Sequence, residues 1–262
     1  MPRWQRENER RAVTLALPTR RDEAWRYADL GAVASIWPLP APERIVVPAG
    51  ERLARVLVQD ATDDAVVVRD YVVELGQGAR ADFHLLNSGG KFGRVTIDVT
   101  LHKGAHFELG AAILGGGDQT LEIVTTMRHV EPGATSNQVV RSVLGGRATG
   151  SYLGKVAVAR HAQKTDASQS AKAMLLARTA TANAKPELEI YADDVKCAHG
   201  CAVGELDAGA LFYLAQRGLP PAQAKALLLR GFIAGVFDDV ADAGLRERLE
   251  AVAAAALDGL LA

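Results

Sequence analysis

The chain has 262 residues, enough for one or two domains with a sizeable core. Lysine and arginine number 30 against 31 aspartates and glutamates, so the net charge of -1 leaves no positive excess to neutralise phosphates, which argues against a nucleic acid partner. Apolar residues make up 48% of the chain but aromatic residues only 5%, so we expect a core built mostly from valine, leucine, isoleucine and alanine.

Residues 1–42 form the first of three predicted regions. Charged residues precede a short apolar run at 12–17 that lacks a small-residue cleavage site, so we expect a charged helical start rather than a secretion signal. Thr19 is a candidate helix N-cap, with Asp22 at the position of a weak capping box. Three prolines within residues 38–42 then mark the end of this helical segment.

Residues 43–203 form a predicted β core, because apolar and polar residues alternate there with the period of two that is typical of strands, most clearly over residues 95–101. Gly-Ala turns follow apolar strands at Gly78, Gly104 and Gly133, which lie 26 and then 29 residues apart. No helix-length segment separates the strands, so the spacing predicts coils stacked on one another, as in a β-helix or β-solenoid. A two-sheet sandwich is the main structural alternative.

Residues 204–262 form a predicted C-terminal helical module. Asp207 can cap a helix that ends at Gly218, and a pair of prolines stands where the next helix begins. Apolar residues nearly encircle that second helix, at 222–237, so it is either buried centrally or binds a partner. A third helix is expected at 245–261.

Cellular location is indicated by the cysteines and by the absence of long apolar runs. Cys197 and Cys201 are the only cysteines, which excludes a disulfide framework and indicates a reducing compartment. The longest apolar stretch, at 251–257, falls far short of the roughly 20 residues that cross a bilayer. We therefore expect a soluble, cytoplasmic protein with no membrane partner.

Several glycine-rich stretches raise the question of a nucleotide site. Residues 76–81 match the dinucleotide pattern G-x-G-x-x-A, with Asp98 about 20 residues further on, but no helix pattern follows the glycines. Residues 89–92 and 115–118 lack the spacing of a phosphate loop, and no G-x-S-x-G motif is present. We interpret the glycines as turns.

Most of the histidines show no metal-ligand spacing. His102 and His106 flank the predicted turn at Gly104, so they are not the i, i+4 pair of one helix. We assign surface or hydrogen-bonded core positions to the five histidines of the β core: His84, His102, His106, His129 and His161. The sixth, His199, lies in a different setting.

The densest group of chemically active residues lies at 192–201. An extended strand projects Cys197 and His199 from the same side, because strand side chains repeat every two residues, and Cys201 follows closely. Thiolate and imidazole ligands suit iron, copper or zinc. The alternative is that these are small, partly buried residues at the last strand. A permanent tetrahedral site also needs a fourth ligand, which would come from another chain or be left open.

This group and its surroundings resemble the C-terminal motif of the SufB/SufD family of the Suf iron-sulfur cluster assembly system. The similarity runs through residues 189–200, 204–207, 211–214 and 217–218. Residues 17–30 are similar to the opening motif of the SufD branch of that family. Two motifs at opposite ends and in the right order make the resemblance specific, and together they cover about a quarter of the chain.

The resemblance implies a right-handed parallel β-helix with helical segments at both ends. It implies a non-catalytic scaffold subunit that pairs with a SufB-like paralogue through the β-helix, or with a second copy when isolated, and binds a SufC-like ATPase through its C-terminal helices. Cys197 and His199 are implicated in forming a transient iron-sulfur cluster, or binding iron, at the interface with the paralogue, with no permanently bound cofactor. The apolar residues expected to contact the ATPase are Leu211, Phe212, Tyr213, Leu227, Leu228 and Phe232.

Two departures from the family pattern affect these expectations. The usual His-Gly-Ala-Thr reads His-Gly-Cys-Ala at 199–202, which adds a thiol and removes a hydroxyl. Cys201 is therefore a weaker candidate than Cys197. The chain is also short for the SufD branch, which predicts fewer β-helix coils or a reduced N-terminal part.

Two other functions compete with the scaffold. One is a free-standing metal-binding protein that uses Cys197, His199 and Cys201. The other is a β-helix carbohydrate-active enzyme with Asp193 and Asp194 as paired carboxylates. Neighbouring residues on a strand point to opposite faces, so these two carboxylates would not flank one glycosidic bond, and the few aromatic residues also count against sugar binding.

Overall fold

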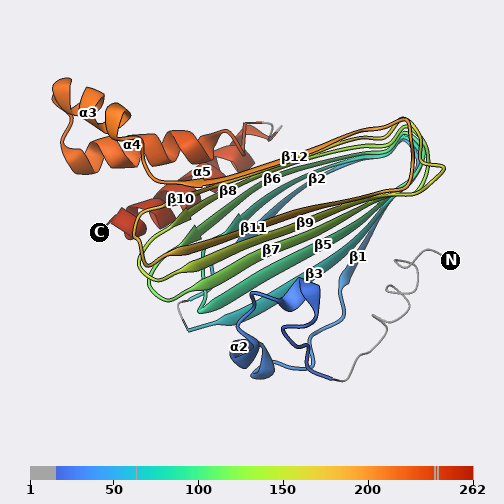
Figure 1. Ribbon diagram of the computed structural model, residues 1–262, viewed down its shortest axis with the longest axis horizontal. Coiled ribbons are helices and arrows are strands. Elements are labelled where there is room, and N and C mark those ends of the chain that lie inside the picture. Colours follow the sequence, from blue (N-terminus) through green and yellow to red (C-terminus); the bar gives the residue numbers. More distant parts are fainter. Residues whose placement is uncertain (1–15, 63, 239, 241, 262) are drawn as a thin grey trace.

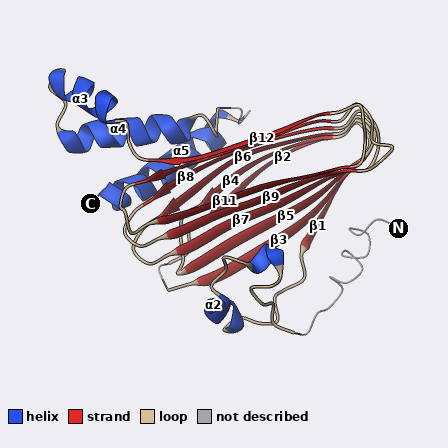
Figure 2. Ribbon diagram, viewed as in Figure 1, coloured by secondary structure: helices blue, strands red, loops and turns tan. Residues whose placement is uncertain are grey.

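The computed structural model describes residues 16–62, 64–238, 240 and 242–261, and the predicted charged helical start lies outside them. Their strands form two parallel sheets that face one another, with helices outside the sheets (Figures 1 and 2). The first sheet has the order β1-β3-β5-β7-β9-β11 and the second β12-β10-β8-β6-β4-β2. The strands are β1 (Glu43–Val47), β2 (Arg52–Gln59), β3 (Val66–Leu75), β4 (Arg80–Asn87), β5 (Phe92–Leu101), β6 (His106–Gly115), β7 (Thr120–His129), β8 (Thr135–Leu144), β9 (Thr149–Val158), β10 (Asp166–Leu175), β11 (Thr181–Ile190) and β12 (Lys196–Gly204).

Successive strands alternate between the two sheets, so the chain winds as a solenoid. Each strand pairs in parallel with the strand two positions later, as Val66 of β3 with Phe92 of β5, and Phe92 with Thr120 of β7. Parallel neighbours need a long connection, and here the intervening strand of the other sheet provides it. The predicted parallel β-helix is confirmed, and the sandwich alternative, whose sheets are antiparallel, is excluded.

The predicted glycine turns form one corner of the solenoid. Gly78, Gly104 and Gly133 have φ of 64°, 65° and 75°, a left-handed conformation that glycine adopts without a steric penalty. The Gly104 amide donates a hydrogen bond to the Pro132 carbonyl of the following turn, which links successive coils. Lys164 has φ of 63° at the same corner, so the turn series continues where the sequence shows no glycine.

The opposite corner accounts for the other glycine-rich stretches. Gly90, Gly117 and Gly146 have φ of 82°, 55° and 59° and lie in the connections that return the chain from the second sheet to the first. Residues 76–79 likewise lead directly into strand β4 rather than into a helix. The interpretation of these glycines as turns is confirmed.

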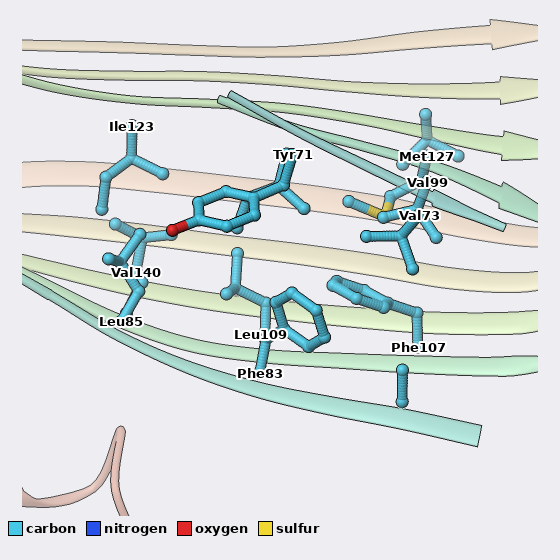
Figure 3. Packing of buried hydrophobic residues seen from close by; sticks show 14 of the residues in the cluster. Tyr71, Val73, Phe83, Leu85, Val99, Phe107, Leu109, Ile123, Met127 and Val140 are labelled. Atoms are coloured by element: carbon cyan, nitrogen blue, oxygen red, sulfur yellow. The ribbon is translucent and has the colours of Figure 1, made fainter. Parts of the chain in front are cut away.

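Alternate side chains fill the space between the sheets. Phe83 of β4 and Phe107 of β6 point toward Val73 and Val99 of the first sheet (Figure 3), and the two ring centroids lie 5.3 Å apart. All four side chains are completely buried. Burying one large apolar side chain is worth about 1.5 to 3 kcal/mol, so these early coils contribute strongly to stability.

The interior also holds buried polar side chains in the coils formed by β7 to β10. The Thr125 hydroxyl donates to Gln138 Oε1 at 2.6 Å, and the Tyr152 hydroxyl donates to the same oxygen at 3.1 Å. Gln169 of β10 lies in register with Gln138 of β8, and both are buried. Buried polar groups cost free energy unless they are hydrogen-bonded, so the hydrogen bonds to Gln138 offset the cost of burying the Thr125 and Tyr152 hydroxyls.

The C-terminal module begins as the sequence predicts. The Asp207 carboxylate accepts hydrogen bonds from two amides of the first helical turn, Gly218 follows the first helix with φ of 85°, and Pro221 opens the second helix. Within the described ranges no helix is long and apolar enough to cross a membrane. The helices are α3 (Ala208–Gln216), α4 (Pro221–Ala234) and α5 (Ala243–Leu261).

Helices α4 and α5 pack on the outer face of the second sheet, and α3 stands away from both sheets (Figure 1). Leu229 and Ile233 of α4 are buried in a cluster with Leu86 of the sheet. Gly110 of β6 permits this close approach, because a Cβ there would lie 2.0 Å from the Val236 carbonyl oxygen. One face of the apolar helix α4 therefore packs against the second sheet of the same chain.

The N-terminal segment departs from the prediction. The Asp22 carboxylate accepts a hydrogen bond from the Thr19 amide at 2.7 Å, as in a capping box. Only a short 3-10 helix follows, η1 (Glu23–Trp25), and the first described α-helix is α2 (Leu30–Ala34). The capping interaction therefore stabilises a turn and does not begin a long helix.

A buried ion pair holds this segment against the first sheet. Arg94 Nη1 lies 2.6 Å from Glu122 Oε2, and both side chains are 1% exposed. Arg94 Nη2 also donates to the Ala24 carbonyl at 2.7 Å, and the guanidinium lies 3.9 Å from the Trp25 ring centroid. The cation–π contact and the ion pair together fix the tryptophan of the N-terminal motif.

Candidate functional site

The cysteines and His199 lie on β12, which pairs only with β10 and is an edge strand of the second sheet. Cys197 is in register with Ala167 and His199 with Gln169, two buried residues that face the solenoid interior. Cys201 is in register with the equally buried Ala171. All three side chains therefore occupy inward positions of the last coil, and Cys197 and His199 share a face as predicted.

A structured turn precedes β12. Lys164 Nζ forms an ion pair with the Asp194 carboxylate, and the Asp194 amide donates to Gln163 Oε1 at 2.9 Å. Asp193 and Asp194 thus lie in a turn rather than on a strand, and Asp194 has a lysine partner. The site offers no facing carboxylate pair of the kind that the carbohydrate-enzyme alternative requires.

Cys197 is half-buried and packs against the apolar cluster inside the solenoid. Burial, and to a smaller extent the nearby Asp166 carboxylate, raise the pKa of the Cys197 thiol above its ordinary value. The sulfur therefore keeps its proton at neutral pH. Because the thiolate is the form that binds metals, a cation brought to this sulfur would release the proton.

The three candidate ligands do not converge within this chain. Cys197 and Cys201 are four residues apart on one strand, a separation of about 13 Å at the rise of an extended chain. Across the described ranges, no group of three or more histidine, cysteine, aspartate or glutamate side chains is placed to hold a metal ion. This geometry counts against the free-standing metal-binding alternative.

Gln169 is the inward-facing residue next to His199, and sequence reasoning missed it. It is 3% exposed, and neither its Oε1 nor its Nε2 has a hydrogen-bond partner within the described part of the chain. A buried amide without partners is uncommon and calls for an explanation. The repeat of the coils could have pointed to Gln169, because aligning the predicted turns places residue 169 next to residue 199 on the neighbouring coil.

Four of the five histidines of the β core lie where the sequence predicts, at the surface or in hydrogen-bonded positions, and these are His102, His106, His129 and His161. The fifth, His84, is buried. His102 Nδ1 lies 3.1 Å from Glu131 and Nε2 lies 3.3 Å from Glu74; burial opposes protonation, but these two hydrogen bonds raise the pKa of His102. His129 is fully buried, with Nε2 3.0 Å from Ser136 Oγ, and its burial lowers the pKa of His129 to about 4.

The residues predicted to contact the ATPase differ in exposure. Phe212 and Tyr213 of α3 are 66% and 57% exposed, and Leu227 of α4 is 52% exposed. Leu211, Leu228 and Phe232 are half-buried, and Phe232 packs against the cluster under α4. No residue of α3 is buried, so its apolar side chains contribute little to packing within the chain.

Comparison with known proteins agrees with this architecture. The chain matches the family described as SUF system FeS cluster assembly, SufBD core domain, over residues 43–232. It is 33% identical over 178 residues to an iron-sulfur cluster assembly SufBD family protein of Synechocystis, covering 67% of this chain and 39% of that protein. It is 28% identical over 176 residues to the iron-sulfur cluster assembly protein SufD of Escherichia coli, covering 67% and 42%.

The alignment with a third relative covers a larger share of both chains. An iron-sulfur cluster assembly SufBD family protein of Mycobacterium tuberculosis is 30% identical over 215 residues, which is 79% of this chain and 54% of that protein. The chain thus spans between 39% and 54% of the lengths of these relatives. Because the matched residues 43–232 take in the whole solenoid, α3 and nearly all of α4, the chain belongs to the SufB/SufD family of iron-sulfur cluster assembly proteins.

Proposed function

We propose that the chain is a non-catalytic scaffold subunit of an iron-sulfur cluster assembly complex, in which it pairs with a SufB-like paralogue and binds a SufC-like ATPase. The observation that supports this most is the position of Cys197 and His199 at the unpaired end of the solenoid. A ligand pair placed at an edge coil is accessible to a second protein. Both cysteines are free, as the reducing cytoplasm would keep them.

The incomplete ligand set indicates how the subunit would work. Cys197 and His199 are two residues apart on one strand, close enough for a thiolate and an imidazole to reach a common ion. Iron or a nascent cluster would be cargo held between two subunits, with the remaining ligands supplied by the paralogue. An incomplete set on each side allows the cargo to leave when the subunits move apart.

The edge of β12 supports pairing at this end. Among the strands that the structure describes, none pairs with the outer backbone groups of β12, and Val203 is 50% exposed. Unpaired strand edges bind other strands readily. A paralogue that covers this edge would also cover the inward face of the last coil and exclude water from the cargo.

Helix α3 supports the second contact. Phe212 and Tyr213 form an exposed aromatic pair on a helix that has no buried residue of its own. Exposed aromatic side chains are typical energetic centres of protein interfaces. We therefore place the ATPase on α3 and the adjacent face of α4, away from β12.

The test is to co-express the chain with SufB-like and SufC-like partners and purify the complex without oxygen. Cluster content is measured by absorption and Mössbauer spectroscopy for the wild type, Cys197→Ser and the matched variant Cys201→Ser. We expect Cys197→Ser to assemble with both partners but to carry little cluster, because a hydroxyl lacks the soft donor character of a thiolate.

Cys201→Ser should resemble the wild type, since Cys201 lies about 13 Å along the strand from Cys197. A wild-type cluster content in Cys197→Ser would remove this residue from the site. Failure of the wild-type chain to co-purify with either partner would refute the scaffold role itself.

A further inference from the structure

The two ends of the solenoid both present edge strands. The first coil consists of β1 and β2, and the last coil of β11 and β12. A second copy of the chain could place its last coil against the first coil of this one and continue both parallel sheets. Such a head-to-tail contact leaves a free edge at each end of the pair and would therefore build an open filament.

Charged side chains occupy inward positions of the first coil. Arg55 of β2 is in register with the buried Phe83, and Glu43 of β1 is in register with the buried Tyr71. Arg69 lies on β3 in the second coil, in register with the buried Val95, and no residue of β1 covers it because β1 begins at Glu43, in register with Tyr71. In the following coils the positions in register with Arg55 carry buried, uncharged side chains, namely Phe83, Leu109, Gln138 and Gln169.

These charges form a connected group across the opening. Arg55 Nη2 lies 2.7 Å from Glu43 Oε1, which links the second sheet to the first. The Arg55 guanidinium lies 5.7 Å from the centroid of the Tyr71 ring, which Figure 3 shows lying between the sheets. Arg69 Nη1 donates to the Val58 carbonyl of the edge strand β2 at 3.1 Å. We call Glu43, Arg55 and Arg69 the first-coil plug.

The last coil has no equivalent. Its inward positions are those in register with interior-facing residues of β9 and β10, such as Tyr152 and Val156 of β9 and Ala167 of β10. None of them carries a permanently charged side chain, and they are Ala182, Ala184, Pro186, Leu188, Ile190, Cys197, His199, Cys201 and Val203. The first-coil end of the solenoid therefore carries charged inward side chains, and the last-coil end carries none.

We propose that the first-coil plug blocks head-to-tail stacking of copies of this chain, so that association is restricted to the last coil. Stacking would remove the Glu43–Arg55 ion pair and the Arg69 guanidinium from water without supplying new hydrogen-bond partners, and taking even paired charges out of water is unfavourable unless further hydrogen bonds satisfy them. Inward-pointing charges on edge strands are one of the means by which proteins prevent edge-to-edge association. The inference does not depend on the proposed cluster-assembly role.

The test compares the mass of variants by sedimentation velocity over a wide range of concentration. In Glu43→Leu/Arg55→Leu/Arg69→Leu the charges are replaced by apolar side chains, and we expect the weight-average mass to rise to at least about twice that of the wild type as concentration increases. The charge-swapped Glu43→Arg/Arg55→Glu keeps a plug of reversed polarity and should keep the wild-type mass. The matched control Asp118→Leu/Arg147→Leu removes an exposed ion pair from a turn and should also keep it.

A second variant separates stacking from aggregation of misfolded chains. Adding Cys201→Lys to the triple variant places a charge at an exposed inward position of the last coil, the surface that stacking would use. We expect this addition to return the mass to the wild-type value. A triple variant that stays at the wild-type mass while its circular dichroism is unchanged overturns the proposal, and so does association that Cys201→Lys does not reverse.

Discussion

Gln169 lies beneath the last coil, and among the residues that the structure describes neither end of its amide has a hydrogen-bond partner. Gln59 is a matched contrast, because it is equally buried but donates to the Gly89 carbonyl at 2.6 Å and accepts from the Ala61 amide at 3.0 Å. We expect Gln169→Met to raise the free energy of unfolding by about 1 kcal/mol, and Gln59→Met to lower it by about 1 to 3 kcal/mol. Chemical denaturation of the two variants measures both changes.

The same Gln169→Met chain tests whether this amide belongs to the site. The Gln169 amide lowers stability, so its presence needs another reason. If its removal lowers the cluster content of the purified complex, that reason is a role in function. We expect that content to fall although the protein is at least as stable as the wild type. Unchanged cluster content would show that Gln169 is only a feature of the interior.

His129 makes the stability of the chain sensitive to acid. Its pKa is lowered by burial from 6.5 to about 4, so the folded state binds this proton less readily than the unfolded state. The stabilisation is present above the ordinary pKa and is lost as pH falls, by about 3 kcal/mol between pH 6.5 and 4. His129→Gln should remove most of this slope in denaturation measured at several pH values.

The exposed His161 is the control for this measurement. His161→Gln should follow the pH profile of the wild type. A wild-type slope in His129→Gln would assign the acid sensitivity to other groups, such as the carboxylates of the ion pairs.

A substitution on helix α3 tests the proposed contact with the ATPase. Phe212 and Val46 are 66% and 67% exposed, but Val46 lies on β1 of the first sheet, whereas the C-terminal helices pack on the second sheet. Burying a large apolar side chain in an interface is worth about 1.5 to 3 kcal/mol, so Phe212→Glu should weaken ATPase binding at least about tenfold. Val46→Glu should leave the affinity unchanged.

Titration of the purified chain with the SufC-like ATPase by calorimetry measures both affinities. Because both side chains are exposed, neither substitution disturbs the core. Equal affinities for the two variants would place the ATPase elsewhere on the molecule.

Local sequence rules predicted several elements well. The cap at Asp207, the end at Gly218 and the start at Pro221 are each determined by backbone chemistry within one turn of the helix. The alternation of the strands and the glycine turns at the corners could also be predicted, because they too depend on local backbone chemistry. Lys164 was missed because a hydrogen-bonded turn holds a lysine in the left-handed region, and its sequence resembles an ordinary loop.

Contacts across the whole molecule were less predictable. The Thr19 and Asp22 pattern suggested a helix, but Trp25 is instead held by Arg94 from a strand far away in sequence. The family motif singled out Cys197 and His199 as candidate ligands, and strand periodicity predicted that they share a face; their inward direction comes from the register with β10. The amide of Gln169 beside them depends on the register of the coils, which no local pattern specifies.

The pairing scheme has a consequence for the order in which the molecule becomes structured. Lys196 pairs with Asp166, thirty residues earlier, and every coil is templated by the coil before it, as in a one-dimensional array whose units contact only their nearest neighbours. The last coil contacts only the coil before it, so its geometry depends on all the preceding coils being folded. Cys197 and His199 are therefore presented side by side only on a chain whose β10 is already in place, so an incompletely folded subunit cannot display the ligand pair.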